Sequence, residues 1–459
     1  MNSTKIERVG LIRWGLLAVI LCSCEKYLDI DVPHDQLVPA TVFSDEALAD
    51  GAIAGIYQEM MFDRATNFAN GGTNSVTALM DVASGALVFN HGSAEVEAFE
   101  ARNWLPANSM VYVLWSSTYK AVFRANEVLE GLTVNKESLT SALAARLRGE
   151  ALFVRAFCHA QLVPLFGGVP LVITTDYRIT SRLPRTTPEE IYNQLEKDLR
   201  EAMEILPADY SHAFGERMRP NRWAAALLLA RIYLYQQRWK EAAHVSSTIL
   251  AHNDLYELVP STDVYLKDNK EAIWQLLVLE NSRATHEGLE GLPNPVLNTP
   301  PRFSYSATAM EAFDSDDQRT LNWVGSYTMP DGEQVYNFIN KYKIRSNPVN
   351  VPPNEASMVM RLTEAYLIRA EARIRMDDGV GALADINTVR MKHGGLTPLN
   401  ELNADVLMDV IERERLIEFT YEWGHRWSDL KRWGRNEALL PIPYRELEAN
   451  PFLVQNIGY

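Results

Sequence analysis

Cysteine is scarce in this chain. Only three occur in 459 residues, and two of them, Cys22 and Cys24, lie close together near the N-terminus. Cys158 has no partner if the first two are removed or modified, so no internal disulfide is available. The fold must therefore be stabilised by a packed apolar core, for which a hydrophobic content of 47% is sufficient.

Excess positive charge is also absent. The chain has 44 Lys and Arg residues against 59 Asp and Glu, a formal net charge of −15. Loss of the first 23 residues would make it more negative still, because they carry Lys5, Arg8 and Arg13 but only one acid, Glu7. Such a surface repels phosphate backbones and anionic headgroups. We expect no nucleic-acid partner.

The apolar run near the N-terminus is too short for a membrane span. Residues 14–22 form it, which is about half of the ~20 residues that a spanning helix needs. The run follows a basic start and precedes Ser23 and Cys24, a pattern typical of a secretory signal. The sequence Leu21-Cys22-Ser23-Cys24 resembles a bacterial lipobox, in which Cys24 is lipidated and becomes the N-terminus. Ordinary secretion with an unmodified cysteine is the alternative.

Three segments follow from this interpretation. Residues 1–23 are predicted to be a lipoprotein signal peptide, and residues 24–43 a lipidated N-terminus with an extended arm. Residues 44–459 are predicted to form a single domain.

Motifs of common enzymes are missing. The nine histidines include no pair at short metal-ligand spacing, and no G-x-S-x-G elbow occurs. The stretch Gly379-Val380-Gly381-Ala382-Leu383-Ala384 matches a dinucleotide-binding pattern, but it follows a predicted helix rather than a strand. A turn between two helices is favoured there, and we expect no cofactor.

A local acidic cluster leaves two interpretations open. Asp314, Asp316 and Asp317 could bind calcium or serve a glycosidase. Beside Arg319 they could equally cap a helix and form a turn. We predict no metal ligand among the site residues.

A second group of acids lies on a predicted helix. Glu414 and Glu418 share one face, as paired acids of a glycoside hydrolase must. The neighbouring Arg413 and Arg415 would hold both carboxylates ionised, which suits ion-pair networks better than a proton-donating acid. We predict that the protein is not an enzyme.

Helical periodicity dominates from Ser44 onward. Thr187-Pro188-Glu189-Glu190 combines a threonine cap, proline at the first helical position and acids in the first turn, so a helix begins there. Other apolar positions recur at helical spacing: Leu48, Ile53, Ile56 and Tyr57; Trp115, Tyr119, Val122, Ala125 and Val128; Leu147, Ala151, Val154 and Phe157. The sequence therefore predicts a mostly α fold with little β structure.

A weak internal repeat has the spacing of a tetratricopeptide helix pair. Its positions are Leu229, Ala230, Tyr233, Ala242 and Ile249, and again, 370 − 230 = 140 residues later, Arg369, Ala370, Arg373, Ala382 and Val389. Trp239 falls in the turn of the first copy and Asp377-Asp378-Gly379 in that of the second. Small residues at Ala230 and Ala242 would let the paired helices approach closely.

A proline-rich stretch separates these copies. Residues 280–353 hold eight prolines and many aromatic residues, which indicates a large loop region with short strands near residues 334–342. Long ordered loops on a rigid scaffold commonly carry binding sites.

Taken in order, the landmarks resemble the SusD/RagB family of outer-membrane nutrient-binding lipoproteins. In the first half they are Ser23-Cys24-Glu25-Lys26-Tyr27-Leu28-Asp29, Ala125-Asn126, Arg148-Gly149-Glu150-Ala151, Phe166-Gly167-Gly168-Val169-Pro170 and Arg185-Thr186-Thr187. In the second half they are Arg361-Leu362-Thr363-Glu364-Ala365-Tyr366, Ile411-Glu412-Arg413-Glu414-Arg415, Arg426-Trp427-Ser428-Asp429-Leu430 and Pro441-Ile442-Pro443. The resemblance covers nearly the whole chain after residue 23.

The resemblance implies a single α-α superhelical domain with tetratricopeptide-like helix pairs and long ligand-binding loops. It implies a surface lipoprotein of the outer membrane that binds glycans and caps a TonB-dependent transporter of the SusC/RagA kind. A peptide ligand, or a role mainly as a lid for the channel, is the alternative. The shared Arg413, Glu414, Glu418, Arg426 and Asp429 would then form buried charge networks rather than touch ligand.

Glycan sites combine exposed aromatic rings with amide, carboxylate and guanidinium groups. Two loop regions have this composition, residues 62–104 and 302–336. Our candidate ligand-binding residues are Asn67, Phe68, Asn103 and Trp104 in the first and Arg302, Tyr305, Trp323 and Tyr327 in the second. Burial of each aromatic ring against the scaffold is the alternative. We assign Trp115, Trp223, Trp239, Trp427 and Trp433 to the core.

Overall fold

A computed structural model describes residues 42–62, 65–134, 138–278, 285–348 and 351–459. The predicted signal peptide, Cys24 and almost all of the predicted arm lie outside these residues. Within them the fold is mostly helical, as the sequence predicts, with six short strands in two small sheets. No helix among the described residues is both long enough and apolar enough to cross a bilayer.

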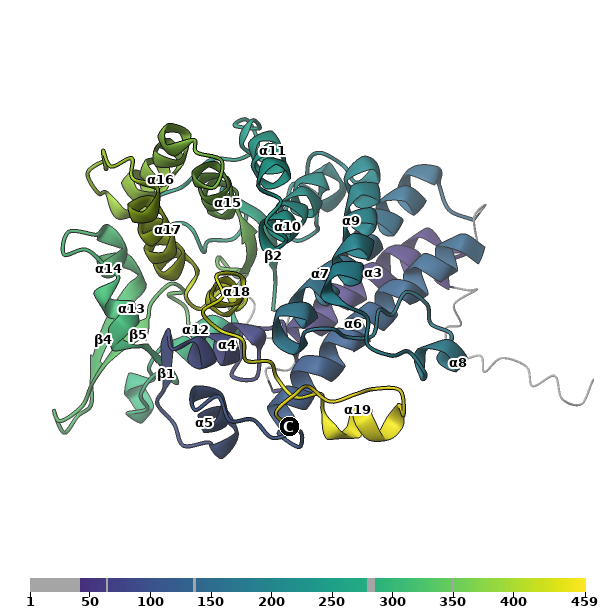
Figure 1. Cartoon of the computed structure of the whole chain (residues 1–459), viewed down its shortest axis with the longest axis horizontal. Coiled ribbons are helices and arrows are strands. Elements are labelled where there is room, and N and C mark those ends of the chain that lie inside the picture. The colour runs from purple at the N-terminus through teal and green to yellow at the C-terminus, as the bar shows by residue number, and fades with distance from the viewer. Residues whose placement is uncertain (1–41, 63–64, 135–137, 279–284, 349–350) are drawn as a thin grey trace, which may run out of the picture.

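The described part of the N-terminal half is mostly helical, with four long helices and three short ones (Figure 1). The long helices are α3 (Glu46–Met61), α6 (Ser109–Val134), α7 (Ser141–Phe166) and α9 (Pro188–Ile205), and the short ones are α4 (Val76–Ser84), α5 (Ala94–Glu100) and α8 (Tyr177–Thr180). α9 begins with the predicted capping box, in which the Thr187 hydroxyl accepts from the Glu190 amide and the Glu190 carboxylate accepts from the Thr187 amide. α3 is capped by Asp45, one residue after the predicted Ser44.

The C-terminal half alternates helices with short strands. Its helices are α10 (Arg222–Tyr235), α11 (Trp239–Leu250), α12 (His286–Gly291), α13 (Ala307–Glu311), α14 (Gln318–Trp323), α15 (Leu362–Ile374), α16 (Gly379–Gly394), α17 (Ala404–Phe419), α18 (His425–Arg432) and α19 (Tyr444–Ala449). Two 3-10 turns, η1 (Ser211–Ala213) and η2 (Pro295–Leu297), complete it.

The predicted repeat corresponds to two helix pairs, α10–α11 and α15–α16. Both turns place one residue in the left-handed region, Gln237 with φ 58° and Asp377 with φ 62°, at equivalent positions. Equivalent backbone bonds also close them, because the Arg238 amide donates to Tyr233 and the Asp378 amide donates to Arg373. All four small residues at the helix contacts are fully buried: Ala230, Ala242, Ala370 and Ala382. The pairs pack side by side through α11 and α15, as in a helix-pair superhelix.

One large cluster of buried apolar residues runs from Phe43 to Ile442 and joins both halves. Strands β2 (Ala272–Leu276) and β6 (Ser357–Arg361) lie antiparallel and wholly buried within this core. The other four strands lie beyond the helix pairs at one end of the molecule (Figure 1). That end carries both loop regions in which the ligand site is predicted.

Candidate functional site

A four-stranded antiparallel sheet joins the two predicted loop regions. Its order is β1 (Leu87–Phe89), β3 (Phe303–Tyr305), β5 (Val335–Ile339) and β4 (Val324–Thr328). Strand β1 comes from the first region and β3 to β5 from the second, and Val88 lies opposite Ser304 where the two meet. The structure therefore brings together segments more than 200 residues apart in the sequence. The β4–β5 hairpin projects from the lower left of the molecule (Figure 1).

One face of this sheet carries a row of aromatic rings. Tyr327 and Tyr336 are direct cross-strand partners, and Phe338 lies opposite Gly325. Directly opposed residues share a face, and so do residues two apart on a strand, so all three rings lie on the same side. A β-carbon at Gly325 would overlap the Phe338 ring, so glycine is needed for that ring to lie across β4. We call Tyr327, Tyr336 and Phe338 the aromatic strip.

The strip is partly open to solvent. All three rings are half-buried, whereas Asn337 between two of them is exposed. Neither tyrosine hydroxyl bonds to another group within the described part of the chain. The strip thus offers apolar ring surface together with two hydroxyls that are free to bond a ligand.

Fixed polar groups border the inner end of the strip. The Ser304 hydroxyl donates to Asn90 Oδ1 over 3.1 Å, and the Asn90 amide donates to the Pro301 carbonyl over 3.0 Å. Ser304 shares the face of Phe338, its partner across β3 and β5. Nearby, Arg302 Nε lies 2.5 Å from Glu290 Oε2, with the Arg302 side chain still 39% exposed. These bonds fix the direction in which each group presents its remaining donors and acceptors.

Four of the aromatic residues that we predicted to bind ligand are buried instead. For these four, the prediction of a ring exposed for stacking is wrong. Phe68 packs edge-on against Trp423, and Trp104 packs edge-on against Trp427. The Trp323 indole donates to the Ser261 carbonyl over 2.8 Å, and Tyr305 points into the core against Phe313. No ring face of these residues is open to a sugar. Their exposed fractions are 1% for Phe68, 1% for Trp104, 0% for Trp323 and 5% for Tyr305. Burial of a large apolar ring lowers the free energy of the folded state, so such rings pack into the core unless the fold prevents it.

The polar candidates divide in the same way. Asn67 is buried and holds the local backbone, because its amide donates to the Glu59 carbonyl over 2.6 Å and accepts from the Ala69 amide. Asn103 is exposed just beyond α5, and Arg302 and Tyr327 lie beside and within the aromatic strip. The structure thus retains Asn103, Arg302 and Tyr327 as candidates.

Sequence reasoning did not assign Phe338, Asn90 or Ser304 to the site. A signal for the hairpin was present, because Pro330-Asp331-Gly332 is a typical turn sequence between two alternating segments. The turn forms there, with Gly332 at φ 76° and the Met329 amide donating to the Gln334 carbonyl. Phe338, two residues beyond Tyr336 on the next strand, would have followed from that turn.

Two tryptophans assigned to the core are not fully buried. Trp115, Trp223 and Trp427 are buried as predicted, but Trp239 and Trp433 are half-exposed. Both line a cavity between helices that is separate from the sheet.

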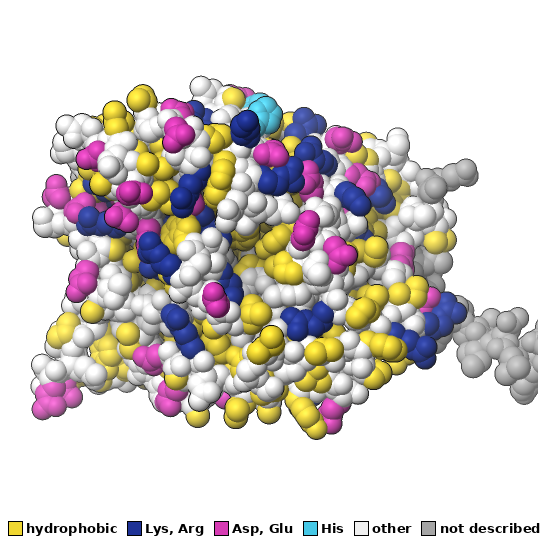
Figure 2. All heavy atoms as spheres, in the orientation of Figure 1, with side chains coloured by type: hydrophobic (Ala, Val, Ile, Leu, Met, Phe, Trp, Pro, Cys, Tyr) yellow, Lys and Arg dark blue, Asp and Glu magenta, His cyan; other side chains and the backbone are white. Residues whose placement is uncertain are grey.

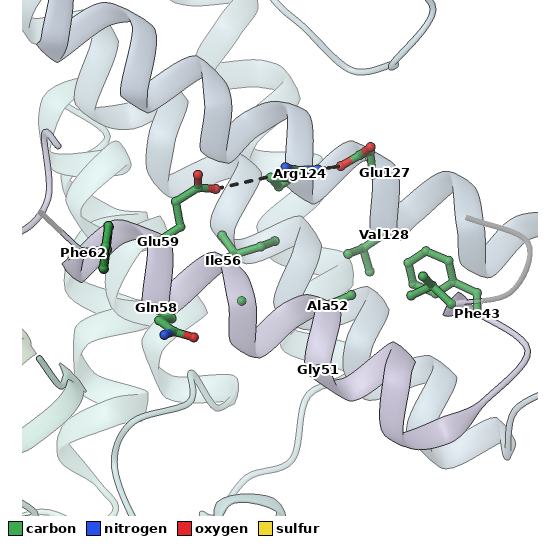
Figure 3. A pocket seen from close by; sticks show the side chains of 12 residues that line it. Phe43, Gly51, Ala52, Ile56, Gln58, Glu59, Phe62, Arg124, Glu127 and Val128 are labelled. Atoms are coloured by element: carbon green, nitrogen blue, oxygen red, sulfur yellow. Dashed lines mark hydrogen bonds and ion pairs between the residues drawn. The ribbon is translucent and has the colours of Figure 1, made fainter. Parts of the chain in front are cut away.

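A further groove of about 530 Å³ lies between α3 and α6 (Figure 3). Phe43 and Phe62 stand at its two ends with aliphatic side chains between them. Its polar groups pair with one another, since Arg124 lies 2.8 Å from Glu127 and 3.9 Å from Glu59. Its lining is therefore less suited to hydroxyl-rich ligands than the strip is.

The acids that could suggest catalysis are engaged in structure. Glu414 and Glu418 both bind Arg319, at 2.7 and 2.6 Å, and all three side chains are fully buried. Burial alone would raise the pKa of Glu418, but His393, Arg361 and Arg319 bring it well below its usual range. The carboxylate is thus held ionised, the opposite of what a proton-donating acid requires.

The acidic cluster near residue 314 is likewise structural. Asp317 caps α14 and pairs with Arg319 at 2.7 Å, while Asp314 pairs with Arg413 at 2.5 Å. Asp429 pairs with Arg415 at 2.7 Å in a buried pair, as the resemblance implies. Arg413 and Arg426 differ from that expectation, because both are only partly buried; Arg426 lies 3.0 Å from Glu412. Among the described residues no group of three His, Cys, Asp or Glu side chains is arranged to hold a metal ion.

Two other carboxyls have raised pKa values but no access to a substrate. Burial raises the pKa of both Asp81 and Glu287 to about 7. Both side chains are enclosed, with Asp81 accepting from the Tyr421 amide and Glu287 from the Ser357 hydroxyl. They do not form an accessible acid pair.

Comparison with known proteins agrees with this architecture. Residues 26–234 match a family model described as starch-binding and associating with the outer membrane, and residues 302–439 match the SusD family model. The chain belongs to the SusD/RagB family. The first match begins two residues after Cys24, and the second includes strands β3, β4 and β5 of the sheet together with α13 to α18.

Relatives and solved structures of the SusD family cover nearly the whole chain. A SusD-like protein of Formosa agariphila is 24% identical over 95% of this chain and 97% of its own length. A SusD superfamily protein from Bacteroides vulgatus has a TM-score of 0.77 at 21% identity, covering 91% of this chain and 100% of that one. A structure described as a laminarin-binding SusD-like protein has a TM-score of 0.72 at 22% identity, covering 90% and 100%. At this identity the structural likeness shows the SusD fold.

Proposed function

We propose that this SusD-family protein binds nutrient glycans at the aromatic strip and passes them, uncleaved, to a TonB-dependent transporter of the SusC/RagA kind. The aromatic strip carries the proposal. Sugar rings present flat C–H faces that stack on aromatic rings, and hydroxyls that bond to fixed polar groups. Tyr327, Tyr336 and Phe338 supply the first kind of surface, and Asn90 and Arg302 supply the second.

The surroundings of the carboxyl groups support a binding role without catalysis. Hydrolysis of a glycoside needs two carboxyls across a bound sugar, one of them with a raised pKa. The carboxyls with raised pKa values of about 7, Asp81 and Glu287, are enclosed in the core. Glu290, beside the strip, is paired with Arg302 and Thr73.

Location at the outer membrane, through lipid on Cys24, is part of the same proposal. The matched family model is described as associating with the outer membrane, and one structural neighbour is described as binding laminarin. A tethered protein whose site is a shallow strip can hold a chain loosely enough to release it. Weak, reversible stacking suits transfer to a transporter better than an enclosed pocket does.

Binding and cleavage can be tested together on a soluble form that begins at Glu25. Native affinity electrophoresis through gels containing laminarin, starch, gelatin as a peptide probe, or no polymer should show retardation in at least one glycan gel. Long incubation with the retained glycan should release no smaller saccharide. Release of product would contradict the non-catalytic proposal, whereas retardation by peptides alone would favour the peptide-binding alternative.

A further inference from the structure

A second concave site lies between the helix pairs, away from the sheet. It is a cavity of about 410 Å³ enclosed by the α10–α11 turn, α15, α17 and the end of α18. Figure 2 shows a hollow near the middle of this face with Lys and Arg side chains around it. The volume falls within the range of ~300–1,000 Å³ typical of small-molecule sites. We call it the helix-turn pocket.

One wall of the pocket is held rigidly. Trp433 follows α18, and its indole N–H donates to Glu371 Oε1 over 3.1 Å. Arg432 binds the other oxygen of the same carboxylate over 2.6 Å, and its guanidinium lies 4.6 Å from the centre of the Trp433 ring. Burial of Arg432 and Glu371 makes this wall part of the scaffold rather than a mobile surface side chain.

The Trp239 ring also lines the pocket. Trp239 is the first residue of α11, and its ring is half-buried against the core. Its indole N–H donates to no group in the described part of the chain, unlike those of Trp433, Trp427 and Trp323. A tryptophan with an open N–H at the lip of a cavity can both stack on a ligand and donate to it.

Three polar side chains that line the pocket have no hydrogen-bond or ion-pair partner among the described residues. Arg375, Asp409 and Gln237 make no side-chain hydrogen bond or ion pair there, although Arg375 lies 5.8 Å from the Trp239 ring centre. They come from three different places: Arg375 is the C-cap residue of α15, Asp409 lies in α17 and Gln237 lies in the α10–α11 turn. The pocket thus gathers a cation, an anion and an amide that are all free to bond a ligand.

The charges on the lining select a neutral ligand. Three acids, Glu371, Asp409 and Glu412, face three arginines, Arg375, Arg432 and Arg435, so the formal charges cancel. A cationic ligand would be repelled near the Trp433 ring, because the guanidinium groups of Arg432 and Arg435 lie 4.6 and 5.9 Å from the ring centre. An anionic ligand would meet Asp409, which no cation neutralises.

We infer that the helix-turn pocket is a second carbohydrate site, which takes one neutral pyranose unit against Trp239. Asp409 and Arg375 bind vicinal hydroxyls of the sugar, as carboxylate and guanidinium groups do when they accept and donate in pairs. The Gln237 amide and the Trp239 N–H serve further hydroxyls. The inference is independent of the aromatic strip, because no residue is shared between the two surfaces.

The test measures the two surfaces separately. The soluble form is labelled with 5-fluorotryptophan, and the Trp239 resonance is assigned by its loss in Trp239→Phe. Maltohexaose, laminarihexaose, xylohexaose and mannohexaose are the neutral probes, and hexagalacturonate is the anionic one. At least one neutral probe should shift the Trp239 resonance, while hexagalacturonate should not.

Substitutions on the rim distinguish the pocket from the strip and from misfolding. Asp409→Ala and Arg375→Ala replace exposed side chains, so the thermal unfolding midpoint should stay unchanged, but the response of Trp239 should weaken about tenfold in affinity. Tyr336→Ala should leave that response intact. The inference is overturned if no neutral probe shifts Trp239, if Asp409→Ala binds as tightly as the wild type, or if only hexagalacturonate binds.

Discussion

His393 provides a quantitative test of the buried charge network. It lies in α16 with its Nε2 atom 2.9 Å from Glu271 Oε2 and its Nδ1 atom 3.1 Å from Glu418 Oε1. Both nitrogens can donate only in the protonated ring, so the fold binds the imidazolium form. Burial alone would lower the pKa of His393, but the two carboxylates raise it from 6.5 to about 9.

The magnitude follows from that difference in pKa. A shift from 6.5 to about 9, at roughly 1.4 kcal/mol for each unit, corresponds to about 3 kcal/mol of folding free energy. Because the folded pKa is raised, the contribution is fully present below pH 6.5. It is lost as the pH rises through about 9, where the folded protein also releases the proton. Arg361 and Arg319 bind Glu418 as well and help to keep its carboxylate ionised across this window.

Urea unfolding near pH 6 and near pH 10, for the wild type and His393→Gln, measures the effect. The wild type should lose about 3 kcal/mol more than the variant between the two conditions. Ionisation of Asp81 and Glu287 also lowers the free energy of unfolding as the pH rises. That loss is complete above their pKa values of about 7 and is the same in the wild type and the variant. Equal losses in the two proteins would refute the assignment of an imidazolium to His393.

Three further predictions concern burial and attachment. Trp323→Ala should lower the free energy of unfolding by about 3–5 kcal/mol, because the side chain is fully buried. Leu321→Ala should lower it by less than about 0.5 kcal/mol, because that side chain is 80% exposed. Similar midpoints of thermal unfolding for the two variants would contradict this. Burial raises the pKa of the Cys158 thiol, so a soluble form that begins at Glu25 should react with a thiol reagent only after denaturation, and rapid labelling of the folded form would count against it. Cys24→Ala should move the protein from the membrane fraction to the soluble fraction with its glycan affinity unchanged; retention in the membrane would exclude Cys24 as the anchor.

The helical scaffold could be predicted because its signals are local. Ala230 and Ala370 sit at equivalent places in two helix pairs, and Thr187 starts α9 with the predicted capping box. Caps, turns and helical periodicity depend on neighbouring residues, so a single sequence carries them. The family motifs extended this to the order of the helices.

The candidate site could be predicted only as a region. Pairing of β1 with β3 depends on contacts between residues more than 200 apart, which no local pattern encodes. Aromatic composition pointed to the loops that carry the strip but did not separate exposed rings from buried ones. Trp323 and Tyr336 both lie in the second loop region, yet one is buried and the other half-exposed. The same limit explains why we assigned Trp239 and Trp433 to the core. Both lie in helical sequence patterns, which do not reveal the cavity that the two residues line.

The most direct test of the central claim compares the affinity of one glycan for the wild type and for a double variant of the aromatic strip. Isothermal titration calorimetry measures both affinities, with the glycan that binds the wild type in the gel assay. Tyr327→Ala together with Tyr336→Ala removes two facing rings from a projecting hairpin, whereas Tyr444→Ala removes a tyrosine that is 55% exposed on α19. We predict an affinity about 5- to 150-fold weaker for the double variant, since each of the two stacking rings contributes roughly 0.5–1.5 kcal/mol, and no change for Tyr444→Ala. Equal affinity of the double variant and the wild type would contradict glycan capture at the aromatic strip.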